Sequence, residues 1–134
     1  MAGMDRNHKP RRFSLEDRFI EFAAVVMNIV DSLPDSRPGN HVLTQLLRSG
    51  SSPAPNYAEA LSAESRRDFI HKLGIALKEL RETHVWLRIV KRMQFLPENL
   101  MLDHAIAECN ELTAILVASI NTAKKNLGKR QESV

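Results

Sequence analysis

Residues 69–90 read FIHKLGIALKELRETHVWLRIV, and one set of positions in this stretch recurs in steps of four and three. An α-helix has 3.6 residues per turn, so this spacing places the whole set on one side of a helix. The pattern predicts a helix over about residues 63–95 that buries one face. The expected core positions are Phe69, Leu73, Ala76, Leu80, Thr83, Leu87 and Val90.

The same rhythm predicts a helix on the N-terminal side of this stretch and another on its C-terminal side. The first begins at Ser14, whose side chain is expected to accept a hydrogen bond from the amide of Asp17. Its expected core positions are Leu15, Phe19, Phe22, Val26, Ile29 and Leu33. The last helix is expected to open with Glu98 after the turn at Pro97, and to fray near Gly128. Its expected core positions are Leu102, Ala105, Cys109, Leu112, Leu116 and Ala123.

A further helix is predicted over about residues 40–61, after the proline- and glycine-containing break at residues 34–39. Its expected core positions are Leu43, Leu47, Gly50, Ala54, Tyr57 and Leu61. Pro53 and Pro55 lie inside this segment, and each removes an amide donor and crowds the preceding turn. Because the apolar phase continues across them, we expect a kinked helix there. Gly50 and Ala54 would let a neighbouring backbone approach closely.

Four helices joined by short connections predict an all-α, antiparallel up-down four-helix bundle. The expected organisation is a basic N-terminal tail (1–12), the bundle (13–127) and a short C-terminal tail (128–134). No apolar run in the 134 residues reaches the ~20 needed to span a bilayer. The single cysteine, Cys109, excludes an internal disulfide. These features predict a cytoplasmic protein.

Positive charge is unevenly distributed along the chain. Residues 1–12 and 124–134 each carry a net charge of +3, whereas residues 13–123 carry −3. Such tails either contact phosphate or act as solubilising ends, and the sequence favours neither reading. The predicted helix over 63–95 also has five basic residues within about 80° of its circumference. The candidate nucleic-acid contacts are Arg67, Lys78, Arg81, Arg88, Arg92, Arg11, Arg12, Lys124 and Lys125. Alternatively, Asp103, Glu108 and Glu111 of the last helix could neutralise the stripe.

A second apolar series runs along the outside of the same helix. Ile75, Glu79, Glu82, Trp86, Ile89 and Met93 repeat the 4–3 spacing, and the C-terminal half of the series is apolar. A helix of a monomeric bundle is expected to be polar on this side. The last helix has a similar series of small residues, which allow close helix approach. We therefore predict a subunit interface through Ile75, Trp86, Ile89, Met93, Ala107, Ala114 and Ala118.

No pattern for catalysis is present in the sequence. Di-iron bundles need two Glu-x-x-His motifs, and here the histidines are dispersed. His104 and Glu108 lie four residues apart, where an ion pair is favoured over a metal site. Cys109 lies on a core face, and no nucleophile elbow, Walker loop or dinucleotide fingerprint occurs. We predict a non-enzymatic protein without metal or other cofactor.

One extended run of residues resembles a family signature. It comprises residues 45–52 (QLLRSGSS), 56–60 (NYAEA), 62–65 (SAES), 68–73 (DFIHKL), 75–79 (IALKE) and 81–83 (RET). Over about residues 13–125 the chain resembles the four-helix bundle proteins grouped with those encoded in intervening sequences of bacterial 23S rRNA genes. It departs from their pattern at Pro53 and Pro55. Arg48, Asn56 and Glu59 match the motif and lie near the kink. We expect them to satisfy backbone groups freed by the prolines or to form a buried polar network, in preference to a ligand site.

The resemblance implies a homopentamer of antiparallel bundles with no established enzymatic activity. It extends to accessory proteins of diversity-generating retroelements, which form basic pentamers that bind a reverse transcriptase and nucleic acid. The leading hypothesis is therefore a homo-oligomeric scaffold that binds RNA or DNA. The alternative is an interaction module that docks a partner protein without nucleic acid. A membrane partner is not expected.

Overall fold

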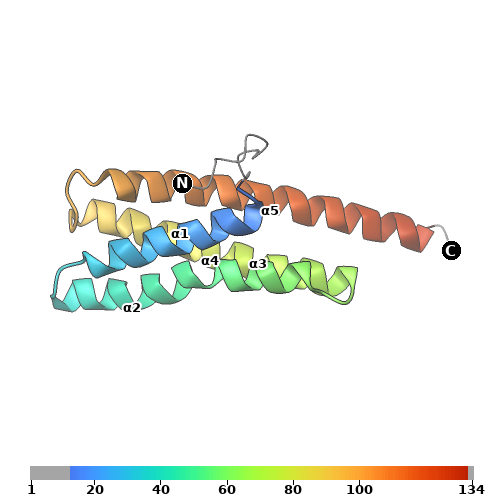
Figure 1. Ribbon diagram of the computed structural model, residues 1–134, viewed down its shortest axis with the longest axis horizontal. Coiled ribbons are helices and arrows are strands. Elements are labelled where there is room, and N and C mark those ends of the chain that lie inside the picture. The colour runs from blue at the N-terminus through green and yellow to red at the C-terminus, as the bar shows by residue number, and fades with distance from the viewer. Residues whose placement is uncertain (1–12, 133–134) are drawn as a thin grey trace, which may run out of the picture.

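The computed structural model describes residues 13–132, with side chains described through residue 129. Five helices occur in this part of the chain, and no strand is found there. Their bounds are Leu15–Asp31 for α1, Arg37–Ser51 for α2, Pro53–Leu61 for α3, Arg66–Arg92 for α4 and Leu100–Glu132 for α5. Figure 1 shows that α2 and α3 follow one another along one rod, so that five helices form four rods. The predicted all-α antiparallel four-helix bundle is confirmed.

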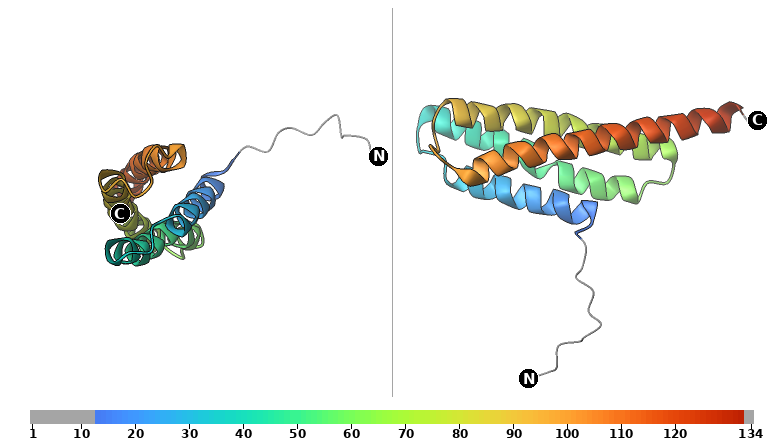
Figure 2. Two further views of the ribbon diagram at one scale, coloured as in Figure 1. Left: turned by 90° about the vertical axis from the view of Figure 1, so that its left-hand side faces the viewer. Right: turned by 90° about the horizontal axis from the view of Figure 1, so that it is seen from above.

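The two helices α1 and α4 occupy opposite corners of the bundle. Each packs against α2, α3 and α5, and within the described residues the backbones of α1 and α4 do not meet. In the end-on view of Figure 2, α5 and the α2–α3 rod lie between them on either side. The outer faces of α1 and α4 therefore point in opposite directions. The C-terminal end of α5 extends beyond the other helices.

Polar side chains begin four of the helices by satisfying amides that have no partner within the helix. Ser14 accepts from the amide of Asp17 as predicted, and Asp17 accepts from the amide of Ser14, which completes a capping box. The side-chain oxygens of Ser36 and Ser65 accept from the amides of Gly39 and Asp68 and so cap α2 and α4. Asn99 accepts from the amide of Leu102 at the start of α5.

The core seams predicted for α1, α4 and α5 are confirmed. From Phe19 to Ile29 the predicted seam of α1 is buried, and Leu15 and Leu33 pack at its ends. Every predicted core position of α4 from Leu73 to Val90 is buried, and so is every one of α5. Long apolar side chains in a regular 4–3 spacing were enough to identify these three faces.

The seam predicted for the second rod is confirmed only in part: Gly50 is buried and Leu43, Ala54 and Tyr57 pack against the core, but Leu47 and Leu61 are exposed. Leu46 is 0% exposed, whereas the predicted core residue Leu47 is 40% exposed. The outer end of the predicted seam, Leu61, is also exposed. The buried face of this rod consists of Gly39, Val42, Leu46, Ser49, Gly50, Pro53 and Ala60. Most of these residues are glycine, serine or proline, so hydrophobicity alone does not identify the face.

The second rod divides at Ser52, between α2 and α3. Pro53 and Pro55 occupy the first turn of α3, where amides have no helical partner in any case and proline is tolerated. The kink predicted near these prolines corresponds to this division. The side-chain amide of Asn56 donates to the carbonyl and to the hydroxyl of Ser52, both at 3.0 Å, and so closes the turn at the break.

Two contacts set the register of α1 against the α2–α3 rod. A Cβ atom on Gly50 would lie 2.4 Å from Cγ1 of Val26, so glycine is required for this close approach. Nearer the other end, the rings of Phe19 and Tyr57 stack with centroids 4.8 Å apart. The close approach expected at Gly50 is thus made by Val26.

Several helix ends differ from the sequence prediction. α2 begins at Arg37 and includes Pro38 and Gly39, because its first turn does not require their amides. α4 is shorter at both ends than the predicted 63–95. Glu98 does not open α5: it adopts a left-handed backbone with φ 53°, and Asn99 caps the helix instead. α5 continues past Gly128 to Glu132. The N-terminal tail (1–12) lies outside the described residues.

Candidate nucleic-acid interface

Five of the eight basic residues of α4 form what is termed here the basic stripe, and all five have exposed side chains. They are Arg67, Lys78, Arg81, Arg88 and Arg92. None of them takes part in an ion pair within the part of the chain that the structure describes. The expectation that neighbouring acids neutralise this stripe is therefore wrong for the described residues.

The acids that were expected to pair with the stripe pair with other basic residues. Asp103 accepts from Lys91 at 2.8 Å. Glu108 and Glu111 both accept from Arg18 of α1, Glu111 at 3.2 Å. Each of these pairs joins two helices, so the bundle uses its acids to connect rods. The ion pair expected between His104 and Glu108 is replaced by the pair with Arg18.

The stripe has two parts that differ in their surroundings. Its N-terminal part meets the C-terminal half of α5, because a depression lined by both α4 and α5 joins residues 66–69 to residues 118–126. Lys124 and Lys125, both exposed, lie at this end. We call Arg67, Lys78, Arg81, Lys124 and Lys125 the basic end. The remaining candidate contacts, Arg11 and Arg12, lie outside the described residues.

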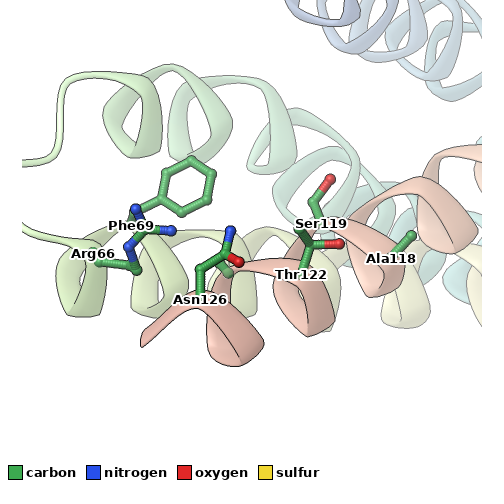
Figure 3. Close-up of a pocket in the computed structure, with 7 residues that line it drawn as sticks. Arg66, Phe69, Ala118, Ser119, Thr122 and Asn126 are labelled. Carbon is green, nitrogen blue, oxygen red and sulfur yellow. The ribbon is translucent and has the colours of Figure 1, made fainter. Parts of the chain in front are cut away.

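The depression at the basic end has an open volume of about 380 Å³. Figure 3 shows Arg66 and Phe69 of α4 on one side and Ser119, Thr122 and Asn126 of α5 on the other. It offers one cation and three neutral hydrogen-bonding side chains. It contains no acid–base or nucleophile–base pair, so its residues suit contacts with a polar ligand better than catalysis.

The C-terminal part of the stripe alternates with apolar residues. Val85, Arg88, Ile89 and Arg92 line a shallow groove of about 240 Å³, which we call the α4 groove. Val85 is half-exposed, and so is Met93, the residue that follows α4. Charge and apolar surface are therefore combined in this groove, whereas hydroxyl and amide side chains of α5 contribute to the depression at the basic end.

The residues predicted for a subunit interface lie in three different environments. Ile75 is half-buried. Trp86 and Ile89 pack partly against the core of their own chain, and the ring of Trp86 meets His41 of α2 edge-on, with centroids 5.8 Å apart. Met93 is exposed, and so are Ala107, Ala114 and Ala118 of α5. The flank of α4 that holds Trp86 thus partly serves contacts with α2, and the interface remains a prediction.

A second exposed apolar series was missed in the sequence. Phe13, Ile20 and Met27 follow one another at seven-residue spacing and are 68%, 54% and 46% exposed. Ile20 and Met27 lie on one side of α1, and Phe13 precedes the cap residue Ser14; we call these three residues the α1 ridge. The signal was present in the sequence, but the stronger core seam of the same helix hid it.

The motif residues Arg48, Asn56 and Glu59 link the rods near the break. Arg48 of α2 pairs with Glu79, at 3.2 Å, and with Glu82 of α4. Glu59 of α3 accepts from Lys72 of α4 at 2.7 Å. With the Asn56 contacts to Ser52, these bonds give all three residues a structural role, although the network is exposed and not buried.

The single cysteine is sealed in the core. Cys109 is 0% exposed and donates to the carbonyl oxygen of Leu80 at 3.2 Å. Burial raises the pKa of its thiol to about 12, so the thiolate is not formed at neutral pH. Within residues 13–129, no group of three or more His, Cys, Asp and Glu side chains could hold a metal ion.

No helix among the described residues has both the length and the apolar character that crossing a bilayer requires.

Comparison with known proteins identifies the fold and the family. The sequence model of the family described as 23S rRNA-intervening sequence protein matches residues 14–118 of this chain. A crystal structure of a protein of unknown function from the S23 ribosomal protein family of Bacteroides thetaiotaomicron is 34% identical, with a TM-score of 0.73. The match covers 80% of this chain and 98% of that one. No curated protein matches this chain.

Proposed function

This chain belongs to the family of 23S rRNA-intervening sequence proteins, and on that premise we propose that it is a non-enzymatic, homo-oligomeric scaffold that binds nucleic acid, RNA in particular. The basic end is the proposed contact surface. One observation supports this choice most strongly: the five residues of the basic stripe have no acidic partner within the described residues, although acids are present on the neighbouring helix.

The arrangement suits a phosphate backbone rather than individual bases. Lysine and arginine side chains bind phosphate by releasing counterions, independently of sequence. Among the described residues, the one aromatic side chain that lines the depression at the basic end is the half-buried Phe69, which offers less stacking surface than a fully exposed ring. Assembly would repeat the basic end on every copy and strengthen the field through multivalency. The family resemblance suggests five copies, a mass of five times the 15.2 kDa of one chain.

The test is fluorescence anisotropy with labelled single-stranded RNA and with duplex DNA, at several salt concentrations. Binding should weaken steeply with salt, because each phosphate contact contributes about −0.7 to the log–log slope for a single strand. The combined substitution Arg67→Gln with Lys78→Gln should weaken binding and reduce the slope. Both side chains are exposed and unpaired within the described residues, so the fold should be retained.

The same helix supplies a matched control. Lys72→Gln with Lys91→Gln removes the same charge from α4, but these two lysines already pair with Glu59 and Asp103. The control should retain most of the affinity. A chain that binds neither RNA nor DNA at low salt would contradict the proposal and leave the protein-docking alternative, and so would equal losses in the two pairs of variants.

A further inference from the structure

The α1 ridge is an apolar line with acidic flanks. Glu16, Asp17 and Asp31 lie within about 60° of the line through Ile20 and Met27 on the circumference of α1. None of the three forms an ion pair within residues 13–129. The only basic residue of α1, Arg18, is engaged by Glu108 and Glu111 of α5. The outer face of α1 is therefore apolar and negatively charged.

The α4 groove has the opposite charge and the same mixture of properties. Val85 and Ile89 provide its apolar surface, and Arg88 and Arg92 flank it without acidic partners among the described residues. A single chain thus has two apolar faces of opposite charge. They lie on α1 and α4, at opposite corners of the bundle, and cannot meet within one molecule.

We infer that the α1 ridge of one copy docks into the α4 groove of a second copy. The inference rests on the homo-oligomer of the proposed function and assigns the surfaces that form it. Large side chains at seven-residue spacing can pack into a groove beside a helix, and the acids that flank the ridge then face Arg88 and Arg92. Contact between two ridges would instead bring acids together, which disfavours it.

This contact is heterologous, because two different surfaces meet. Each added copy leaves one free ridge and one free groove, so the assembly closes into a ring or continues as a fibre. The polar basic end is not part of the contact and stays open to nucleic acid. The assembly would therefore display one basic end per copy.

The test uses two variants that each block one surface, Ile20→Asp and Val85→Asp. Both side chains are about half exposed, so the substitutions should leave the helicity measured by circular dichroism unchanged. Light scattering should give a mass above 15.2 kDa for the unaltered chain and one close to 15.2 kDa for each variant alone. An equimolar mixture of the two variants should form a dimer and nothing larger, because one intact ridge meets one intact groove. Leu100→Asp, at an exposed site where α5 begins, is the control that should assemble normally.

Other results would overturn the inference. Either variant assembling like the unaltered chain would do so, and so would a mixture that stays monomeric. If Ile20→Asp or Val85→Asp loses helicity, Met27→Asp replaces the first, and Arg88→Glu with Arg92→Glu replaces the second.

Fluorescence anisotropy with RNA separates the docking inference from the nucleic-acid proposal. Monomeric Ile20→Asp should still bind RNA in a salt-dependent manner through its basic end. Loss of assembly with retained RNA binding supports the docking, whereas an RNA-free but assembling chain contradicts only the nucleic-acid proposal.

Discussion

The α4 rod and the α2–α3 rod each bury one face in the same bundle, but the residue types on the two buried faces differ. α4 is one continuous helix of 27 residues whose buried face is mostly leucine, valine and alanine. The α2–α3 rod is divided at Ser52, and glycine, serine and proline make up most of its buried face. The first rod is held by side-chain volume, and the second is held by close backbone approach and by polar bonds to its neighbours. Substitutions in the two rods should therefore differ in size and in sign.

The largest effect is expected from the true seam of the divided rod. Leu46→Ala should lower the free energy of unfolding by about 2–5 kcal/mol, because it empties a fully enclosed space in the core. Its neighbour Leu47 is 40% exposed, so Leu47→Ala should cost less than half as much. Urea denaturation followed by circular dichroism measures both. Equal losses in the free energy of unfolding would support Leu47 as a core residue, as predicted from the sequence.

Two glycines, one in each rod, should respond in opposite directions to alanine. Gly50→Ala should destabilise by about 1–3 kcal/mol, because its Cβ would lie 2.4 Å from Val26 and force α1 away. A Cβ on Gly74 of α4 would meet no atom within 4 Å, so Gly74→Ala should stabilise by about 0.5–1 kcal/mol through helix propensity. A thermal melt of each variant shows the sign directly. A gain in stability for Gly50→Ala would contradict the close approach.

A buried pair of hydroxyls joins the rods. Thr83 of α4 and Ser49 of α2 are both 0% exposed, and their oxygens lie 3.0 Å apart in a hydrogen bond. Thr83→Val should cost about 1–2 kcal/mol, since the hydroxyl of Ser49 then loses its partner. Ser49→Ala should cost less, because the hydroxyl of Thr83 also donates to the carbonyl oxygen of Glu79 at 2.7 Å. The double variant should cost less than the sum of the two, by about 0.5 kcal/mol or more. Strict additivity in this cycle would mean that the bond contributes nothing.

The smallest effect concerns His84, which follows Thr83 but has no comparable partner. Its Nε2 is buried without a hydrogen bond within the described residues. Burial, and secondly the charge of Arg88, lower the pKa of His84 below its usual value of about 6.5. The unfolded chain then takes up a proton more readily than the folded one. Stability should therefore be fully present above about pH 6.5 and fall as the pH is lowered through that value.

Urea titrations at pH 7 and pH 5 test the role of His84. In His84→Leu the loss of stability between these two pH values should be smaller than in the unaltered chain. An identical difference would assign the pH dependence to other groups.

The predictive power of the sequence differed between the rods for a physical reason. In α4 the series through Leu73, Leu80 and Leu87 has no charged member, whereas the competing series is interrupted by Glu79 and Glu82, so one phase is favoured. In α2 two adjacent leucines, Leu46 and Leu47, gave two possible phases. Gly50 is buried with either phase, so the choice depends on how α1 packs against the rod, where Val26 approaches Gly50. Such a contact involves a second helix, so the local pattern does not contain it.

The candidate site was predictable in its members but not in its pairing. Helical periodicity placed the basic stripe on one face, and the structure confirms that its side chains are exposed. Which acids neutralise which cations depends on the rotation of each helix about its own axis. The sequence therefore assigned Glu108 to the stripe or to His104, whereas Arg18 of α1 binds it.

Because the thiol of Cys109 is enclosed in the core, its rate of chemical modification reports how often the bundle opens. A maleimide or a disulfide reagent reacts with the thiolate, and in the closed bundle neither solvent access nor deprotonation is available. Cys109 lies on α5 and donates to Leu80 of α4, so labelling requires that these two long helices separate. Because no second cysteine exists in the sequence, the rate of modification counts one event at one place. Mass spectrometry over time would thus give the lifetime of the α4–α5 contact without any added probe.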